Sequence, residues 1–504
     1  DSDAALSSVS INRNSAENHG GGIYMYNSEL DFDSENRCSI YLNSTNSFYS
    51  KDIYSSGQDN IDVIVDTFSI DEPTPIYAYP TNNFAFDIQN PLAELLDVDV
   101  YVSPDGSNYN NGTSPEHPFE TIYYASCSIS VSEDNPINIY LDEGEYHTPQ
   151  VFSHIPLPGK SYVNIIGEDP LTTMIEGTNY NEVFYLESIH DFSLLNVRLK
   201  NGEPDVFYAE NSDVLLKNVI FSDNIENERN LYCANSNITL ERVIFHNNST
   251  SNSGIYARTN SHLKILNCTI TGNEITDSGR NISLSNSDAE IINTIFWNES
   301  SNEIGLYVGE SILTVAYSDI HGGEDAIYEI GNDNITNWLE GNIEAEPLFL
   351  APENNNFHLQ DDSPCIDAGT AFFEWNDEII INLSEDEYFG IAPDMGVYEN
   401  ENVHVNNDLD FPTEYFLSQN YPNPFNPITT ISYSLPKTSG VCLNIYNIRG
   451  QKVRTLIDEK QEQGFREFVW DGTDDYNKPV SSGIYFYHFQ TEDFEKVRKM
   501  ILLR

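Results

Sequence analysis

Apolar and polar residues alternate in four copies of one short phrase near the middle of the chain. In the first copy, which begins at Asp213, the apolar positions are Val214, Leu216, Val219 and Phe221. A spacing of two residues is that of a β-strand with one buried face, and the β-branched residues common in these phrases also favour strands. Each copy therefore predicts one or two short strands followed by a turn.

The four phrases share a closing asparagine. These asparagines are Asn224, Asn248, Asn273 and Asn298, so successive copies lie 24, 25 and 25 residues apart. A fixed period of this size is typical of stacked-repeat proteins, whose units are too small to bury a core alone. We expect each asparagine to adopt the left-handed backbone of a corner, and the four side chains to form a ladder.

The predicted fold class is all-β, a right-handed parallel β-helix followed by a C-terminal Ig-like β-sandwich. Between Tyr162 and His321 there is room for roughly six or seven coils at this period. Leucine-rich repeats have a similar period, but they require a Leu-x-x-Leu-x-Leu frame that is absent from the phrases.

Residues 1–96 are interpreted as the tail of an upstream β-helix. Gly20, Gly21 and Gly22 precede Ile23 and Tyr24, which indicates a turn into a strand. This motif resembles the GGGI repeats of polymorphic outer-membrane and autotransported β-helix proteins. The resemblance implies further coils before Asp1.

Residues 97–400 are predicted to form the main β-helix, with an N-terminal cap and a C-terminal closing segment. Phe119, Ile122, Tyr123 and Ala125 would form the apolar face of a short helix that covers the first coil. The stretch around this helix resembles the opening of bacterial secreted β-helix domains of the pectin-lyase-like type.

The closing segment contains the motifs SPCIDAGT, from Ser363, and APDMGVYE, from Ala392. Both resemble segments that close such bacterial β-helices, which implies a structural cap. Its turn positions would be Asp367, Gly369, Asp394 and Gly396. The following residues 401–415 are rich in Asn and acidic side chains and are predicted to be a linker.

Residues 416–504 contain about seven short strands in the pattern of an Ig-like β-sandwich. The module opens on YPNPF, turns at Arg449-Gly450 and ends with a basic strand. It resembles the type A C-terminal sorting domain of the type IX secretion system, whose motifs occur in this order. The motif residues here are Tyr421, Pro422, Asn423, Pro424, Phe425, Gly450, Gly483, Tyr485 and Lys499.

The resemblance implies export across the outer membrane of a Gram-negative bacterium, with the type IX secretion machinery as a partner. In that family the tail is usually removed after export, and the protein is released or attached to the cell surface. The expected location is therefore extracellular or on the outer-membrane surface. The basic residues Lys496, Arg498, Lys499 and Arg504 would guide docking.

The charge of the chain limits its partners. There are 23 Lys and Arg residues against 80 Asp and Glu residues, a formal charge of −57. Nucleic acid and anionic membranes are excluded as partners, because their phosphates are bound by Lys and Arg. The six cysteines form no CxxC pair, which indicates neither a zinc knuckle nor a disulfide-dense domain. No apolar run is long enough for a transmembrane helix.

Both a binding protein and an enzyme remain possible, because parallel β-helices include polysaccharide lyases and glycoside hydrolases. Hydrolysis needs paired carboxylates, but the NTD and GHG signatures of polygalacturonases are absent. A lyase needs a base beside a uronate. The basic residues on adjacent coils are Lys200, Lys217, Arg242, Lys264 and Arg280.

We assign no catalytic, cofactor-binding or metal-binding residue from the sequence. Acidic stretches at Asp31 and Asp471 share the alternating oxygens of Ca²⁺ loops but miss the twelve-residue frame, so Ca²⁺ is the one cofactor considered. We predict a secreted or cell-surface protein that is adhesin-like or binds a polysaccharide or surface glycan. The alternative is a lyase or hydrolase. A groove with a basic residue beside clustered carboxylates would favour catalysis, and a face of Asn, Ser and aromatic residues would favour binding.

Overall fold

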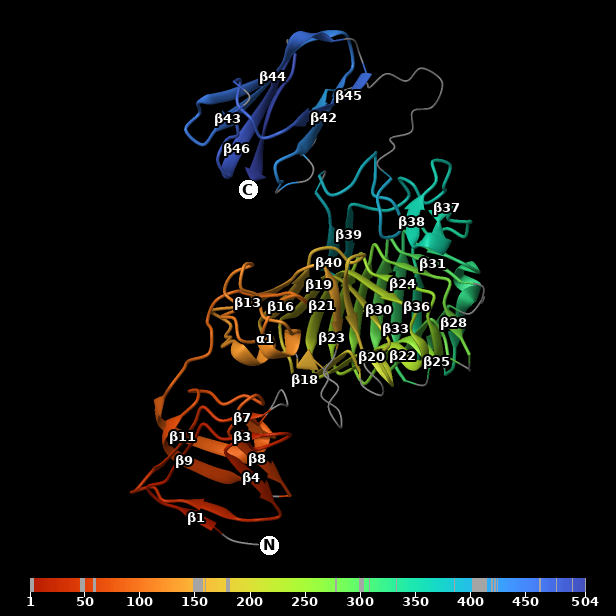
Figure 1. The fold of residues 1–504 in the computed structure, drawn as a ribbon. Coiled ribbons are helices and arrows are strands. Elements are labelled where there is room, and N and C mark those ends of the chain that lie inside the picture. The colour runs from red at the N-terminus through yellow and green to blue at the C-terminus, as the bar shows by residue number, and fades with distance from the viewer. Residues whose placement is uncertain are drawn as a thin grey trace. The chain divides into compact units, whose positions relative to one another are not determined.

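The structure, a computed structural model, divides into two compact units (Figure 1). Unit 1 comprises Asp1–Ile381 and Ala392–Glu399, and unit 2 comprises Asn382–Ile391 and Asn400–Arg504. The structure describes residues 4–45, 50–57, 60–147, 157–158, 160–177, 182–276, 279–298, 303–307, 309–331, 333–384, 386–400, 415–417, 420, 423, 425–461, 464–476, 478–491 and 493–503.

The first coils of unit 1 pair in parallel. Their longest sheet has the order β11-β9-β6-β2, and a second has the order β10-β8-β4. Ile40, Ile53, Val63 and Phe68 form part of a core of their own. The elements are β1 (Ala4–Leu6), β2 (Ser10–Asn12), β3 (Ser15–Ala16), β4 (Ile23–Tyr26), β5 (Leu30–Phe32), β6 (Cys38–Tyr41), β7 (Ser44–Thr45), β8 (Ile53–Ser56), β9 (Ile61–Phe68), β10 (Ala78–Tyr79), η1 (Thr81–Asn83) and β11 (Phe84–Pro91).

The main β-helix has two long parallel sheets. The first follows the order β12-β13-β16-β19-β21-β23-β26-β30-β33-β36 and includes a side arm of short strands, whereas the second runs from β15 to β35. The first comprises β12 (Val100–Val102), β13 (Ile137–Leu141), β16 (Val163–Gly167), β19 (Phe192–Lys200), β21 (Asp213–Ser222), β23 (Asn237–Glu241), β26 (His262–Leu266), β30 (Asp288–Ile292), β33 (Ile312–Ala316) and β36 (Ile335–Trp338). Its side arm comprises β14 (Gly144–His147), β17 (Thr173–Glu176), β24 (Ile244–His246), β27 (Thr269–Thr271), β31 (Ile295–Trp297) and β34 (Asp319–Ile320). The second comprises β15 (Leu157–Pro158), β18 (Phe184–Glu187), β20 (Asp205–Glu210), β22 (Ile225–Ala234), β25 (Ser249–Arg258), β28 (Glu274–Ile275), β29 (Ile282–Ser285), β32 (Ile304–Leu306) and β35 (Ile327–Glu329).

The period of the sequence sets the register of these sheets. Leu194, Leu216, Leu240, Ile265 and Ile291 pair with one another in turn from coil to coil, and all five are fully buried. Alternation with a period of two turns every second side chain into the core of the coil. The predicted parallel β-helix is therefore confirmed, including the expected coils between residues 162 and 321.

The predicted short helix is also present, as α1 (Ile122–Ser128). Phe119, which was expected on its apolar face, lies before the helix and forms a parallel bridge with Val102. The Thr121 hydroxyl accepts a hydrogen bond from the Tyr124 amide at 3.2 Å, which caps the first turn. Ile122, Tyr123 and Ala125 belong to the same buried cluster as β12 and β13. The helix thus packs on the first coil, as expected.

Side chains at each corner accept hydrogen bonds from backbone amides of the preceding coil. At one corner the amides of Ser212, Ser236, Ser261 and Ser287 donate to the hydroxyl of the serine one coil later, at 3.0–3.3 Å. At a second corner the acceptors are the Cys268 thiol, the Thr294 and Ser318 hydroxyls and the Asn342 amide oxygen. Every bond points from an earlier coil to a later one.

The repeated asparagines form the predicted ladder at the third corner. The backbone amide and Nδ2 of Asn224 both donate to Oδ1 of Asn248, and the same pair of bonds joins Asn248 to Asn273 and Asn273 to Asn298. The left-handed backbone lies one residue earlier than expected at the first three rungs. It occurs at Asp223, Asn247 and Gly272.

The ladder has different ends. At the start, the equivalent position in the preceding coil is Gly202, where an added Cβ would lie 2.6 Å from Val206 Cα. At the finish, Glu303 accepts from the Asn298 amide and Nδ2 at 3.1 and 2.9 Å. The first coils repeat this arrangement, with Asn14 donating to Asn43 and Asn43 donating to Asp52.

The closing segment covers the side of the coils. Phe357 and Val397 pack on Ile220 and Ile244, and a second cluster places Leu359, Cys365 and Met395 on Ile295. The Asp367 amide donates to Asp394 Oδ1 at 2.8 Å, which holds the two closing motifs together. The elements before and within it are η2 (Gly323–Ala326), β37 (Phe349–Ala351), η3 (Pro352–Asn354), β38 (Asn356–Leu359), β39 (Phe372–Trp375) and β40 (Glu378–Asn382).

Unit 2 contains a sandwich of two antiparallel sheets, β41-β42-β45 and β44-β43-β46-β47, which confirms the predicted Ig-like module. Trp470, Tyr487 and Phe489 are fully buried at its core. The strands are β41 (Phe416–Leu417), β42 (Thr429–Leu435), β43 (Ser439–Asn447), β44 (Lys452–Gln461), β45 (Gly464–Trp470), β46 (Gly483–Gln490) and β47 (Glu495–Leu502). In the described part of the chain, no helix has the length and apolarity needed to span a membrane.

Cutting the asparagine ladder is expected to destabilise the β-helix. Asn248→Ala leaves the buried amide and Nδ2 of Asn224 without their acceptor, at a cost of about 2–4 kcal/mol. Asn237→Ala is the matched control, because Asn237 makes its side-chain bond to Asp213 on the exposed surface, and it should cost less than about 1 kcal/mol. Urea unfolding followed by circular dichroism measures both. Equal losses would contradict the ladder's role.

Stability is expected to rise as the pH falls from neutral. Burial raises the pKa of Asp52 and Asp319 to about 6 and that of Glu303 to about 7. The unfolded carboxyls titrate near ~4, so between pH ~4 and these values the folded state binds more protons and gains stability with acidification, by roughly 2–3 kcal/mol per group. Urea midpoints across this window measure the slope. Glu303→Gln should make it shallower, and an unchanged slope would contradict the assignment.

Candidate functional site

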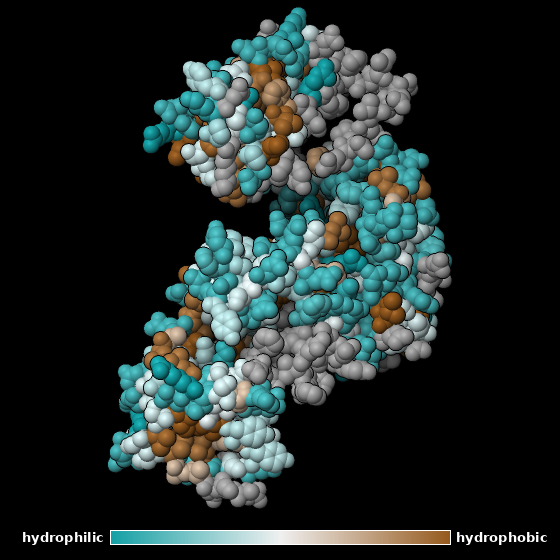
Figure 2. Space-filling view, in the orientation of Figure 1, coloured by the Kyte–Doolittle hydropathy of each residue, from teal (hydrophilic) through white to brown (hydrophobic). Residues whose placement is uncertain are grey.

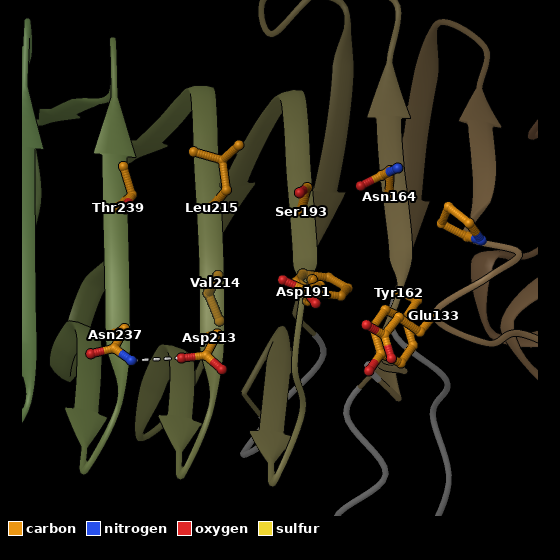
Figure 3. A pocket seen from close by; sticks show the side chains of 12 residues that line it. Glu133, Tyr162, Asn164, Asp191, Ser193, Asp213, Val214, Leu215, Asn237 and Thr239 are labelled. Atoms are coloured by element: carbon orange, nitrogen blue, oxygen red, sulfur yellow. Dashed lines mark hydrogen bonds between the residues drawn. The ribbon is translucent and has the colours of Figure 1, made fainter. Parts of the chain in front are cut away.

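A groove of about 530 Å³ runs across the outer face of the first long sheet (Figure 3). Its floor crosses neighbouring coils at β16, β19, β21 and β23, each of which contributes outward-facing side chains. The lining residues are Glu133, Pro136, Tyr162, Asn164, Asp191, Phe192, Ser193, Asp213, Val214, Leu215, Asn237 and Thr239. The groove therefore follows the axis along which the coils stack.

The floor of the groove is one row of paired positions. Asn164 pairs with Ser193, Ser193 with Leu215, and Leu215 with Thr239. Asn164 Nδ2 donates to Asn138 Oδ1 at 2.9 Å, and Asn138 Nδ2 donates to Asp99 at 3.0 Å. These two hydrogen bonds orient the amide of Asn164. The floor thus presents three polar side chains with one aliphatic side chain among them.

A second row, at the start of the same strands, is acidic. Asp213 Oδ1 accepts from Asn237 Nδ2 at 2.7 Å, and Asp213 Oδ2 lies 2.7 Å from His190 Nδ1 (Figure 3 shows the first contact). The hydrogen bond with His190 lowers the pKa of Asp213, so this carboxylate stays charged at neutral pH. Asp191 and Glu133 are exposed and add two further carboxylates.

The next coil limits the groove. Lys264 follows Thr239 in the row and forms an ion pair with Glu378 of the β39–β40 hairpin. Beside it, His262 Nε2 lies 3.0 Å from Glu290 Oε2, and the hydrogen bond with Glu290 raises the pKa of His262. Both basic side chains at this end are thus paired with carboxylates.

The basic residues considered for lyase chemistry lie outside the lining of the groove. Lys200 is 3.8 Å from Glu176, Lys217 is 2.7 Å from Glu241, and Lys264 pairs with Glu378. Arg242 has a left-handed backbone at a corner, and the Arg280 guanidinium lies over the Tyr328 ring. The structure does not bring these five residues together at one site.

The two acidic stretches considered for Ca²⁺ form turns. Asp33 accepts hydrogen bonds from the amides of Glu35 and Asn36 and from the Ser7 hydroxyl. Asp471 accepts from Arg454 and from Thr473. Asp33 and Asp471 thus hold the turns of their own stretches.

The described residues of the sorting motif support the sandwich. Asn423 Oδ1 accepts from the Ile501 amide at 2.8 Å, and Phe425 is buried against Trp470. Gly450 and Gly483 have positive φ, the Tyr485 hydroxyl donates to Ser481, and Lys499 pairs across the sheet with Phe486. Tyr421, Pro422 and Pro424 lie outside the described residues, as do residues 401–414 of the predicted linker.

The groove is suited to a hydroxyl-rich ligand. It offers amide, hydroxyl and carboxylate groups beside Leu215 and Tyr162, and no Lys or Arg is part of its lining. Figure 2 shows a largely hydrophilic surface over the visible face of the β-helix.

Sequence reasoning missed the groove residues. Asp191, Asp213 and Asn237 stand at the entry to their strands, where a polar residue reads equally well as part of a turn. The repeated phrases did contain a sign of this edge. In all four, Ser stands directly before the strand, and the first residue of the strand is Asp, Asn or His. These columns mark a polar edge that runs along the stack.

Two family models match parts of the chain. Residues 183–343 match a model described as right handed beta helix region, which agrees with the predicted handedness. Residues 427–493 match a model described as FlgD Ig-like domain. A search of curated proteins found no match.

Three similar solved structures share little sequence with this chain. Pectin methylesterase PemA from Erwinia chrysanthemi is 12% identical, with 49% of this chain and 90% of that chain covered and a TM-score of 0.33. Tailspike protein 2 of bacteriophage CBA120 is 11% identical, with 97% and 72% covered and a TM-score of 0.27. PorZ of the type IX secretion system of Porphyromonas gingivalis is 22% identical, with 18% and 11% covered and a TM-score of 0.13.

Proposed function

We propose that this protein is a cell-surface or secreted β-helix protein that binds a polysaccharide along the groove on its first long sheet. The observation that carries the proposal is the row Asn164, Ser193, Leu215 and Thr239, which places three polar side chains and one aliphatic side chain at equivalent positions of successive coils. A linear polymer that lies along the stack can contact each of these coils in turn. Sites for such ligands combine apolar surface with a few oriented polar groups.

The groove charge selects the class of polysaccharide. Glu133, Asp191 and Asp213 place three carboxylates on its rim, within a chain of formal charge −57. A polyuronate would be repelled, whereas neutral or amine-bearing sugars would not. We therefore expect neutral hexose or amino-sugar polymers as ligands.

A lyase or hydrolase is the second candidate, and one pair favours it. His190 is oriented by Asp213 at 2.7 Å beside the groove, an arrangement that general bases use. The groove lining contains no Lys or Arg that would neutralise a uronate carboxylate, and the nearby Lys264 is paired with Glu378. Binding without cleavage is the function that we put forward.

We further propose that the Ig-like module is a type IX sorting domain. Its support is the ordered motif set that resembles that family, including Asn423, Phe425, Gly450 and Gly483. Charge separates the module from the rest of the chain: residues 415–504 hold 11 of the 23 basic residues and 10 of the 80 acidic ones, which leaves 12 basic and 70 acidic residues elsewhere. This division of charge is consistent with an acidic repeat protein that carries a separate, nearly neutral sorting domain.

Blocking the groove should abolish polysaccharide binding. Thr239→Trp fills the floor and Asp213→Ala removes a rim carboxylate, and each should weaken binding on a glycan array at least ~10-fold, as expected when a central contact is lost. Asn90→Ala is the control, since Asn90 bonds to Asp66 on the exposed surface of the first coils. Loss of binding in the control, or no binding of the intact chain to any neutral or amino-sugar polymer, would refute the assignment. Release of unsaturated uronate, read by absorbance, would favour the lyase, and His190→Ala would then test the base.

Removal of the module should stop export. The chain lacking residues 416–504, produced in a bacterium with a type IX system, should accumulate inside the cell while the full chain reaches the surface. Cell fractionation and surface proteolysis measure the difference. Surface exposure of the truncated chain would contradict the sorting role, and it would leave the groove proposal untouched.

A further inference from the structure

A mixed imidazole and carboxylate triad lies on the side arm of the first long sheet, away from the groove lining. Glu145 and His147 belong to β14, and Glu176 belongs to β17. Within the described residues it is the one group of three or more His, Cys, Asp or Glu side chains whose ligand atoms all lie within 4.8 Å of one another. Neither the repeat pattern nor the groove requires this combination.

The sheet fixes the geometry of the triad. Glu145 and His147 are two residues apart on one strand, so both point outward, and His147 pairs directly with Glu176 on the next coil. Between them Tyr146 is buried, and its hydroxyl lies within hydrogen-bond distance of the Val102 and Asp142 carbonyl oxygens, at 3.0 and 2.9 Å. Tyr146 thus holds β14 against the core, and the outward side chains Glu145 and His147 are attached to a fixed backbone.

The two oxygens of Glu176 have different surroundings. Oε1 accepts a hydrogen bond from Asn201 Nδ2 and lies 3.8 Å from Lys200 Nζ. Oε2 lies 3.4 Å from His147 Nδ1 and is directed toward the triad. An outer hydrogen bond that orients a carboxylate is a common feature of metal sites, and it typically affects affinity 10–100-fold.

Lys200 is the feature that opposes a cation here. Its ammonium lies 3.8 Å from Oε1 of Glu176, which is the oxygen that does not contact His147, and it reduces the negative charge of the triad. Two carboxylates and one neutral imidazole still leave a net negative site beside one lysine. We therefore expect Lys200 to lower the affinity and not to abolish it.

We propose that Glu145, His147 and Glu176 bind a divalent first-row transition metal ion, with Zn²⁺ as the reference ion. Imidazole nitrogen selects Zn²⁺, Co²⁺ or Ni²⁺ over Ca²⁺ and Mg²⁺, which prefer all-oxygen sites. Water completes the coordination, because Glu145 and His147 are exposed. The bound ion joins two consecutive coils at their surface.

Two other histidine pairs of the β-helix provide the contrast. His190 has Asp213 at 2.7 Å and His262 has Glu290 at 3.0 Å, and neither pair belongs to such a group of three. A pair supplies two ligands, one fewer than the three protein ligands of zinc sites that also bind water. His190 is therefore a matched control for His147: both are exposed and both contact one carboxylate.

Titration of the chelator-treated full chain with ZnCl₂ tests the proposal. Isothermal calorimetry should show one site distinctly tighter than diffuse binding to the acidic surface, and Co²⁺ at that site should give visible d–d absorption. His147→Ala should weaken the site by more than ~10–100-fold, because it removes a ligand and not an outer partner. Lys200→Met should tighten it several-fold, which a plain ion-pair network would not do.

His190→Ala should leave the tight site unchanged, and excess CaCl₂ should fail to displace Zn²⁺. The proposal is overturned if the intact chain shows only the diffuse binding, if His147→Ala and His190→Ala titrate alike, or if Lys200→Met has no effect. Circular dichroism of each variant confirms folding, which these exposed substitutions should preserve. The outcome is independent of glycan binding.

Discussion

The corners of the coils impose the constraint on which the structure depends. Where a strand bends, its backbone amide can no longer pair within the sheet, and a buried unpaired amide is costly. At all three corners of the main β-helix that amide donates to a side chain of the next coil: a serine, a mixed Cys-Thr-Ser column, or an asparagine. The apolar core fills the coil, but these columns hold successive coils in register.

The same columns organise the surface. Because each corner repeats in register, the residues beside it also repeat, and outward positions form rows along the axis. One such row became the polar floor of the groove, through Asn164, Ser193 and Thr239. Another contains Ile220, Ile244, Thr269 and Ile295. It is mainly apolar and is covered by the closing segment, whose Val397 amide donates to the Thr269 hydroxyl. Binding surface and covered surface thus differ in the side chains that one position carries from coil to coil.

Periodicity predicted the architecture well, because strand alternation and a fixed repeat directly reflect packing. The parallel coils, the helix at residues 122–128, the asparagine ladder and the Ig-like sandwich all followed from it. The left-handed corner residue was placed one position late, since Asn224 itself is buried and Asp223 makes the turn. The lateral cover was missed, although adjacent apolar residues such as Ile244 and Phe245 need burial on both faces of a strand. The groove and the triad depend on residues that meet only across coils, so linear spacing did not reveal them.

The directional asparagine column has a consequence for how such a chain can change its length. Between Asn224 and Asn298 every rung accepts from one neighbour and donates to the other, so a duplicated coil inserted there would find both of its partners. At the far end a carboxyl group replaces the amide, and Glu303 accepts both bonds from Asn298 in place of a further asparagine. At the near end Gly202 has no space for a side chain. Growth or loss of coils is therefore accommodated inside the column and not at either terminus, which makes Gly202 and Glu303 natural boundaries of the repeat array.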